Sequence, residues 1–222
     1  ICNIKNDGAF TDIKDFIHRV NQRKIGKKVI DTLIESGCFD FMKWKRSELL
    51  AYNDQNFENI QKDKHEKKHG IQTLFVNQES KNATRPTQFQ SYKKSYFLLK
   101  EKENLGFYLS GNPIEEYRSL SKKLGLLDLK MIDELSDKKT YRFIAICENV
   151  NIRISQKSGQ KYAILKLSNG FTQFECPIWP RAYETIQTEL IENTVYGVVM
   201  RIEDKASKKF SIQGISQLTK NL

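Results

Sequence analysis

The last third of the chain constrains the fold most, because from Tyr141 onward apolar residues recur at every second position, the period of a strand. Five short runs of this kind are present, and one helical stretch at 181–191 separates the third run from the fourth. In the first run one face is apolar at 143–147 and polar at 149–155, which predicts a strand buried on both sides only at its start. The other face is predicted to stay apolar throughout, at Ile144, Ile146, Val150, Ile152 and Ile154.

The four later runs cover residues 162–168, 171–179, 194–203 and 210–215. Asn169-Gly170 joins the second run to the third and is the strongest two-residue hairpin signal. Pro177 confines the third strand to a sheet edge or a strand end. Three strands, a helix and two strands follow the order of an OB-fold, a small Greek-key barrel. We therefore predict a five-stranded OB-fold domain over residues 140–222.

An OB-fold can bind single-stranded nucleic acid through cationic side chains that contact phosphates and aromatic rings on which bases stack. The candidate residues are Arg153, Lys157, Lys161 and Lys166 around the first loop, Lys205, Lys208 and Lys209 on the second loop, and Tyr162 and Phe171 for stacking. Phe174 alternates with Cys176 and Ile178, which favours a place in the core. For Tyr162 and Phe171 a structural role stays open. Binding is expected to prefer single strands and to depend little on sequence.

The first fifty residues have the period of helices instead. One amphipathic helix is predicted behind Thr11 as its N-cap, with an apolar stripe at Phe10, Ile13, Phe16, Ile17 and Val20. A second helix is predicted up to a cap at Gly37, with a stripe at Val29, Ile30, Leu33 and Ile34. The segment 21–28, NQRKIGKK, makes a short basic turn between them. This is the outline of a helix-hairpin-helix unit, which we place at residues 1–52.

Such a hairpin binds duplex nucleic acid through simple chemistry. Gly26 would let the backbone turn tightly, and free amides at the start of the following helix can point at a phosphate. Lys24, Lys27 and Lys28 add positive charge without contacting bases, so binding would be independent of sequence and sensitive to salt. Two short helices joined by a basic turn also serve as scaffold, and this alternative stays open.

Between these regions the chain is more polar. One further helix is predicted over 46–52, and residues 53–91 are predicted to form a polar linker because they have little to bury. Residues 65–69, HEKKH, match the HExxH pattern of zinc proteases, but the surrounding lysines make this segment unsuited to a dication. An apolar island at 71–75, IQTLF, lies within the linker.

The segment 92–139 is predicted to be a helical connector that contains a rigid corner at 101–117, EKENLGFYLSGNPIEEY. A helix is predicted to end at Gly111, where the missing Cβ permits a left-handed cap. Asn112 is then predicted to cap a new helix, with Pro113 at its first position. The whole chain is accordingly predicted to be α+β.

Three blocks resemble the C-terminal region of the alpha subunit of bacterial DNA polymerase III, the replicative polymerase: KVIDTLIESGCFD at 28–40, the corner at 101–117, and the module from Tyr141 to about Leu218. The resemblance implies duplex binding by the hairpin, single-stranded template binding by the OB-fold, and contact with other holoenzyme subunits. It also implies a nucleotidyltransferase domain upstream of Ile1, with its magnesium. No cofactor is expected in this chain, which has no Asp-x-Asp pair, no phosphate loop and no nucleophile set, so we expect it to be non-catalytic.

The same resemblance extends to the apolar island. Ile71, Gln72, Leu74 and Phe75 are similar to the peptide by which the alpha subunit docks into the sliding clamp. The glutamine lies one place nearer the phenylalanine than the family pattern has it, with Ile71 in its slot. Clamp docking and packing of this island onto a neighbouring domain both stay open, since burying a leucine and a phenylalanine would stabilise either arrangement by roughly 3 to 5 kcal/mol.

Composition supports a polyanionic partner. The 222 residues carry a formal charge of +10, which favours nucleic acid, although a solvated lysine-rich surface would give the same figure. The four cysteines are far apart and contain no CxxC pair, so zinc and redox sites are not expected. Without an apolar run long enough for a bilayer, the chain is predicted to be cytoplasmic and to have no membrane partner. Two alternative functions are an OB module outside replication, such as that of a tRNA synthetase, and a protein-interaction scaffold.

Overall fold

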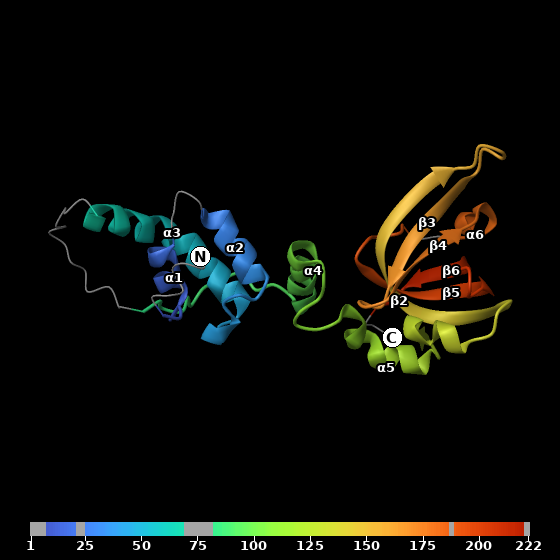
Figure 1. Cartoon of the computed structure of the whole chain (residues 1–222), viewed down its shortest axis with the longest axis horizontal. Helices are drawn as coiled ribbons and strands as arrows, with labels where there is room; N and C mark the ends of the chain where they lie inside the picture. The colour runs from blue at the N-terminus through green and yellow to red at the C-terminus, as the bar shows by residue number, and fades with distance from the viewer. Residues whose placement is uncertain (1–7, 21–24, 69–81, 187–188, 220–222) are drawn as a thin grey trace. The chain divides into compact units, whose positions relative to one another are not determined.

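The chain divides between Ser110 and Gly111 into two units, Ile1–Ser110 and Gly111–Leu222 (Figure 1). The structure, a computed structural model, describes residues 8–20, 25–68, 82–186 and 189–219. The first unit is helical and the second is built around a barrel, so the predicted α+β class is confirmed.

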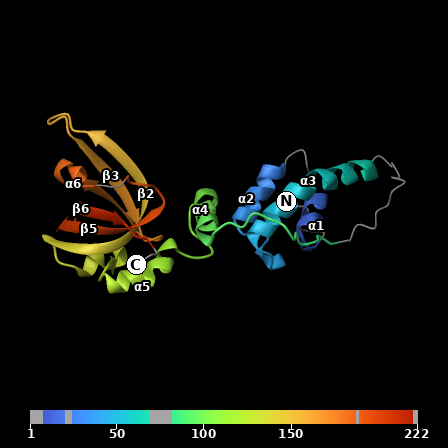
Figure 2. The ribbon, with the colours of Figure 1, turned by 180° about the vertical axis from the view of Figure 1, so that it is seen from behind.

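The first unit packs two short helices against a long one. Its elements are α1 (Ile13–Arg19), α2 (Lys27–Glu35), the 3₁₀ turn η2 (Asp40–Met42), α3 (Arg46–Lys68) and α4 (Lys94–Leu105). Both views of the ribbon place α1 and α2 beside α3 (Figures 1 and 2). Ile13, Ile17, Ile30, Ile34 and Leu49 are fully buried between these helices. The predicted apolar stripes therefore form the core of this unit, except for Val29 of the second stripe, which is 43% exposed.

The caps of the first two helices explain their bounds. The N-cap of α1 is Asp12, whose carboxylate accepts a 2.8 Å hydrogen bond from the amide of Asp15, so the prediction of Thr11 was wrong by one residue. After α2, Gly37 has φ +85°, and the amide of Cys38 donates to the carbonyl of Leu33, as in a Schellman motif. A Cβ at Gly37 would also collide with the guanidinium of Arg46. The predicted cap at Gly37 is confirmed.

The helix predicted over 46–52 is much longer in the structure. Helix α3 continues to Lys68, and Asn53, Phe57 and Ile60 are buried against the first unit's core. These positions continue the helical spacing from Leu49, and the many polar residues between them obscured the pattern. The prediction that periodicity ends at residue 53 was therefore wrong.

The predicted corner is also corrected. Helix α4 ends at Leu105, and Gly106, with φ +85°, is the left-handed cap that we expected at Gly111. Asn112 does cap a new element, because its side-chain oxygen accepts a 2.9 Å hydrogen bond from the amide of Ile114. That element is a 3₁₀ helix, η3 (Pro113–Tyr117), which leads into α5 (Arg118–Lys123).

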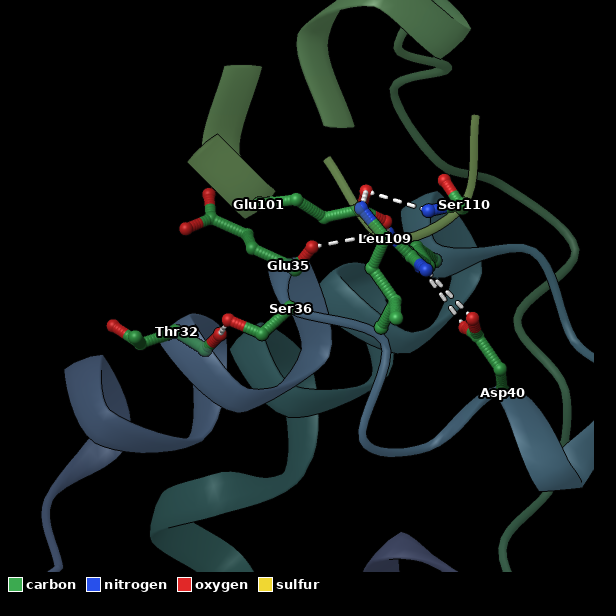
Figure 3. Close-up of polar contacts among 8 residues, drawn as sticks. Thr32, Glu35, Ser36, Asp40, Glu101, Leu109 and Ser110 are labelled. Atoms are coloured by element: carbon green, nitrogen blue, oxygen red, sulfur yellow. Dashed lines mark hydrogen bonds and ion pairs between the residues drawn. The ribbon is translucent and has the colours of Figure 1, made fainter. Parts of the chain in front are cut away.

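A buried ion pair ties the end of the first unit to its core (Figure 3). Glu101 is fully buried, and one carboxylate oxygen accepts from the guanidinium of Arg46 at 2.6 Å. The other oxygen accepts from the amides of Leu109 and Ser110 at 2.7 and 2.8 Å, while Arg46 also forms a bidentate pair with Asp40. Burial raises the pKa of Glu101, but the hydrogen bonds from Ser110, Arg46 and Leu109 outweigh it and hold the pKa below its ordinary value.

The second unit is a closed barrel of five strands. Its elements are β1 (Leu127–Asp128), the 3₁₀ helix η4 (Leu129–Glu134), β2 (Lys139–Ile154), β3 (Lys161–Ser168), β4 (Gln173–Ile178), α6 (Pro180–Glu184), β5 (Thr194–Asp204) and β6 (Lys209–Gln217). The strand order is β1-β2-β3-β4-β6-β5, and pairing of β2 with β5 closes the barrel. The predicted five-stranded OB-fold is confirmed, with β1 as a short additional strand beside β2.

Helix α6 is shorter than the predicted stretch 181–191. It ends at Glu184, yet Ile186 and Leu190 still pack against the barrel core from irregular backbone. The spacing of these apolar residues therefore correctly predicts that they are buried, but it does not predict the end of the helix. The hydroxyl of Tyr196 accepts a 2.8 Å hydrogen bond from the amide of Ile191 and holds this segment in place.

A β-bulge in β2 exchanges the two faces of the strand. The register shifts between Cys147 and Asn149, so Glu148 is an extra residue opposite β3. Cys147 and Val150 consequently share the face that packs into the core, and the prediction of one uninterrupted apolar face from Ile144 to Ile154 was wrong. Ile154, at the end of that predicted face, is 64% exposed.

Candidate nucleic-acid interface

Polar and aromatic side chains lie on the outside of β2, β3 and β4, and the bulge in β2 places that strand's Asn149, Asn151 and Arg153 among them. Cross-strand register arranges them in three rows, which we call the outward face: Asn149, Lys166 and Glu175; Asn151, Ile164 and Pro177; and Arg153 with Tyr162. The alternating residues Leu165, Cys176 and Ile178 are buried in the barrel core. Each row is roughly 7 Å from the next along the strands.

The third row ends in an aromatic pair. Trp179 follows β4 directly, is 54% exposed, and stacks on Tyr162 with ring centroids 5.9 Å apart and planes at 28°. Arg153, Lys157, Tyr162 and Trp179 are among the residues that line a hollow of about 610 Å³ at this place. Trp179 is exposed and Tyr162 is half-buried, and two such rings beside two cations suit a base and its phosphate.

The loop after β2 borders this hollow. Residues 155–160 connect β2 to β3, and both ribbon views show this hairpin extending beyond the other strands, with the loop at its tip (Figures 1 and 2). Lys157 lies in this loop and is exposed. The amide of Ser155 donates to the carbonyl of Gln160, which closes the base of the loop. The hairpin thus carries one cation to the edge of the aromatic pair.

The structure brings together Arg153, Lys157, Tyr162 and Lys166 from the residues predicted for single-strand binding. Trp179 was not predicted, although its alternation with Glu175 and Pro177 on one strand could have placed it on the same face. Lys161 lies directly opposite Ile154 and alternates with Tyr162, so its side chain starts from the other face of β3.

Phe171 lies apart from this face. The third strand was predicted to begin there, but β4 begins at Gln173, and Phe171 is in the turn at the other end of β3 and β4. The side-chain oxygen of Asn169 accepts hydrogen bonds from the amides of Phe171 and Thr172, which fixes this turn. Phe171 is 91% exposed, whereas Phe174 packs edge-on against Phe210 in the core, as predicted.

The second predicted loop has a mixed character. The ammonium of Lys205 donates to the carbonyl of Asp133 at 3.0 Å, and its amide donates to the carboxylate of Asp137. Lys205 therefore stabilises the loop, whereas Lys208 and Lys209 are exposed. This loop lies beside the first residues of β2, since Ile202 pairs with Lys139. Lys157 lies in the loop after the last residue of β2, so the two predicted loops are at opposite ends of that strand.

In the hairpin of the first unit, one of the lysines predicted to bind duplex already has a partner within the chain. Gly26 is the N-cap of α2 with φ −84° and ψ 172°, a conformation open to any residue, and a Cβ at this position would meet no other atom within 4 Å. It therefore makes no glycine-dependent tight turn. The ammonium of Lys27 forms an ion pair with Asp54 of α3, and this hydrogen bond is the main cause of its raised pKa. Lys28 is exposed, and Lys24 lies outside the described residues.

The remaining predicted sites are untouched by the structure. Ile71, Gln72, Leu74 and Phe75 lie outside the described residues. Across the part of the chain that the structure describes, no group of three or more histidine, cysteine or acidic side chains could hold a metal ion. Among the described helices, none combines the length and apolarity needed to cross a bilayer.

Comparisons with known proteins agree with this architecture. Residues 1–49 match the family model described as a helix-hairpin-helix motif. The chain is 34% identical over 210 residues to the DNA polymerase III subunit alpha of Chlamydia pneumoniae, and the match covers 92% of this chain and 17% of the relative. It is 30% identical over 214 residues to the subunit of the same name from Borreliella burgdorferi, with 94% and 18% covered. The chain thus spans less than a fifth of the length of these relatives.

One solved structure also matches part of the chain. It is the crystal structure of the S. pombe Stn1-ten1 complex, with a TM-score of 0.30 and 17% identity over 43% of this chain and 76% of that chain. This similarity is too low to support a conclusion about the fold or the function of the chain.

The fold defines a class first: a protein that joins a helix-hairpin-helix unit to a closed five-stranded, OB-like barrel. The relatives then define the resemblance within that class. As predicted, the chain resembles the C-terminal region of the alpha subunit of bacterial DNA polymerase III over about nine-tenths of its length.

Proposed function

We propose that this chain is a DNA-binding part of a bacterial replicative DNA polymerase, and that its barrel holds single-stranded template on the outward face. The observation that carries the proposal is the aromatic pair of Tyr162 and Trp179 beside Arg153 and Lys157. Rings of this kind stack on unpaired bases, whereas a duplex keeps its bases stacked on one another. The net charge of +10 supports a polyanionic ligand.

Nucleotide transfer lies outside this proposal for the chain. We assign transfer, and the magnesium ions that it requires, to the remainder of a longer protein, because the curated relatives are more than five times as long as the match. Binding to the sliding clamp through residues 71–75, and contact with other holoenzyme subunits, stay proposals that rest on the sequence.

The experiment is fluorescence anisotropy of a labelled single strand and its matching duplex, each titrated with the chain across a salt series. Tighter binding of the single strand, with log K falling linearly with log salt, supports the proposal. Charge reversal of Arg153 and Lys157 should remove the preference. If neither ligand binds at low salt, the proposal fails and the barrel is better explained as a protein-interaction scaffold.

We propose duplex binding by the hairpin as a second function, supported by the match of residues 1–49 to the helix-hairpin-helix family model. The ion pair of Lys27 provides a test of this proposal. Asp54 neutralises Lys27 at the start of α2, where a phosphate would approach. We expect Asp54→Asn to raise duplex affinity about threefold at low salt, because it frees the ammonium of Lys27. The measurement is duplex anisotropy with the full chain.

The control separates this contact from the general loss of negative charge. Glu58 lies one helical turn beyond Asp54, and Glu58→Gln removes the same charge without the hydrogen bond to Lys27. We expect a smaller gain from Glu58→Gln than from Asp54→Asn, and we expect the gain from Asp54→Asn to fall to that smaller size when Lys27 is also replaced by alanine. Equal gains in all three backgrounds would show that Lys27 does not contact the duplex.

A further inference from the structure

The outward face contains a second hollow next to the aromatic pair. Its volume is about 300 Å³, and it is lined by Asn149, Asn151, Arg153, Ile164, Lys166 and Glu175. Arg153 also lines the larger hollow, so the two adjoin. A single strand that stacks on Tyr162 and Trp179 would place a neighbouring nucleotide over this second hollow.

The carboxylate of Glu175 is the unusual group here, because the proposed ligand is a polyanion. Lys166 lies directly opposite Glu175 in the β3–β4 ladder, yet its ammonium is paired with Glu148 at 3.9 Å. Glu175 is exposed and is left without an ion pair among the described residues. Its oxygens are therefore free to accept hydrogen bonds from a ligand.

The other polar groups of the hollow are partly occupied. The amide nitrogen of Asn149 donates to Glu192 at 2.9 Å, in the contact that also holds the bulge. Ile164 provides an apolar surface in the middle row. An apolar surface beside a free acceptor fits a ring with donors on its edge, and a carboxylate repels a phosphate.

The donors on the edge decide which base fits. Cytosine carries an exocyclic amino group, and carboxylates accept hydrogen bonds from this group. Thymine offers one ring N–H between two carbonyl oxygens, and these oxygens repel a carboxylate. The two pyrimidines have similar size, so their stacking on an aromatic pair differs little.

We infer that Glu175 makes the outward face selective, and that the second hollow takes a base with an exocyclic amino group in preference to thymine. This inference rests on the proposed single-strand binding and adds a base preference to it. It also narrows our expectation that binding depends little on sequence, since the preference arises at one nucleotide position while the aromatic pair accepts any base.

The test compares anisotropy titrations of the full chain with oligocytidylate and oligothymidylate of equal length, at one salt concentration. We expect oligocytidylate to bind about fivefold more tightly, and Glu175→Gln to bring the ratio of the two affinities close to one. Using the ratio cancels the general gain in affinity that follows the loss of a negative charge. Glu203→Gln is the matched control, since Glu203 pairs with Arg201 on β5 and its loss should leave the ratio unchanged.

The possible outcomes separate the base preference from the proposed single-strand binding on which it rests. A ratio near one in the unmodified chain overturns the base preference, and a ratio that persists in Glu175→Gln overturns the assignment of the preference to Glu175; both outcomes leave single-strand binding intact. Failure of both oligonucleotides to bind overturns the proposed function and the preference together. Glu175 is exposed, so its substitution should leave the circular dichroism spectrum unchanged.

Discussion

Replacing Glu101 with glutamine is expected to lower the free energy of unfolding of the first unit by about 2 to 3 kcal/mol. The substitution removes the buried charge that pairs with Arg46, and truncating one partner of a buried pair leaves the other charge poorly compensated. Arg46 keeps its bidentate contact with Asp40, which limits the loss. The amides of Leu109 and Ser110 would also exchange a charged acceptor for a neutral one.

Urea denaturation of the full chain measures this effect. The chain has two tryptophans, Trp44 in the first unit and Trp179 in the second, so a Trp179→Phe background makes fluorescence report on the first unit. Glu103→Gln is the control on the same helix, because Glu103 is 47% exposed and pairs only with Lys100 among the contacts described. We expect it to cost less than about 0.5 kcal/mol. Equal losses of unfolding free energy in the two variants would show that the buried pair of Glu101 and Arg46 does not stabilise the first unit more than an exposed pair does.

The same carboxylate predicts a dependence on pH. The folded pKa of Glu101 is depressed below its ordinary value of 4.5, so its stabilisation is fully present above that value and is lost as pH falls through the folded pKa. The difference in unfolding free energy between the unmodified chain and Glu101→Gln should therefore shrink in acid. A difference that stays constant down to strongly acidic pH would exclude an ionised Glu101 as its source.

Replacing Trp179 with alanine is expected to weaken single-strand binding about tenfold or more. Stacking of one base on an aromatic side chain contributes roughly 1 to 3 kcal/mol, and Trp179 also holds Tyr162 in place through their ring contact. Tyr162→Ala should have a similar effect, and the double variant should lose less than the sum of the two because the rings are in contact. Anisotropy with a labelled single strand measures all three.

Phe171 provides the matched control for this prediction. It is an exposed aromatic residue of the same barrel, but it lies at the opposite end of β3 and β4 from the aromatic pair. Phe171→Ala should leave affinity for the single strand nearly unchanged. A loss as large as that of Trp179→Ala would show that the strand crosses the other end of the sheet.

Much of the barrel could be predicted from the sequence because its strands have a clear period of two and one turn signal, Asn169-Gly170. The bulge at Glu148 could not be predicted. One inserted residue exchanges the two faces of the strand, and the residues on each face remain compatible with a strand either way. That exchange decides which side chains form the outward face. The sequence pattern also does not predict the stacking partner of Tyr162, because Trp179 directly follows the last residue of β4, where alternation along the strand ends.

In the first unit the errors came from composition and from glycine. The polar residues of α3 hide a buried stripe that continues through Phe57 and Ile60, so the sequence pattern predicts a linker where the structure has a helix. Two glycines, Gly106 and Gly111, both suited a helix end, and only the buried contact of Glu101 with the following amides selects the first. Pairing of Lys27 with Asp54 joins residues far apart in sequence, which no local pattern indicates.

The most direct test of the outward face is photo-crosslinking of the full chain to a single-stranded oligonucleotide that contains 5-iododeoxyuridine, followed by mass spectrometry of the crosslinked peptides. The proposed function predicts crosslinks at Tyr162 and Trp179, which are exposed enough to stack on the modified base. Crosslinks found only at Phe171, or only in the turn that carries Lys208 and Lys209, would contradict it.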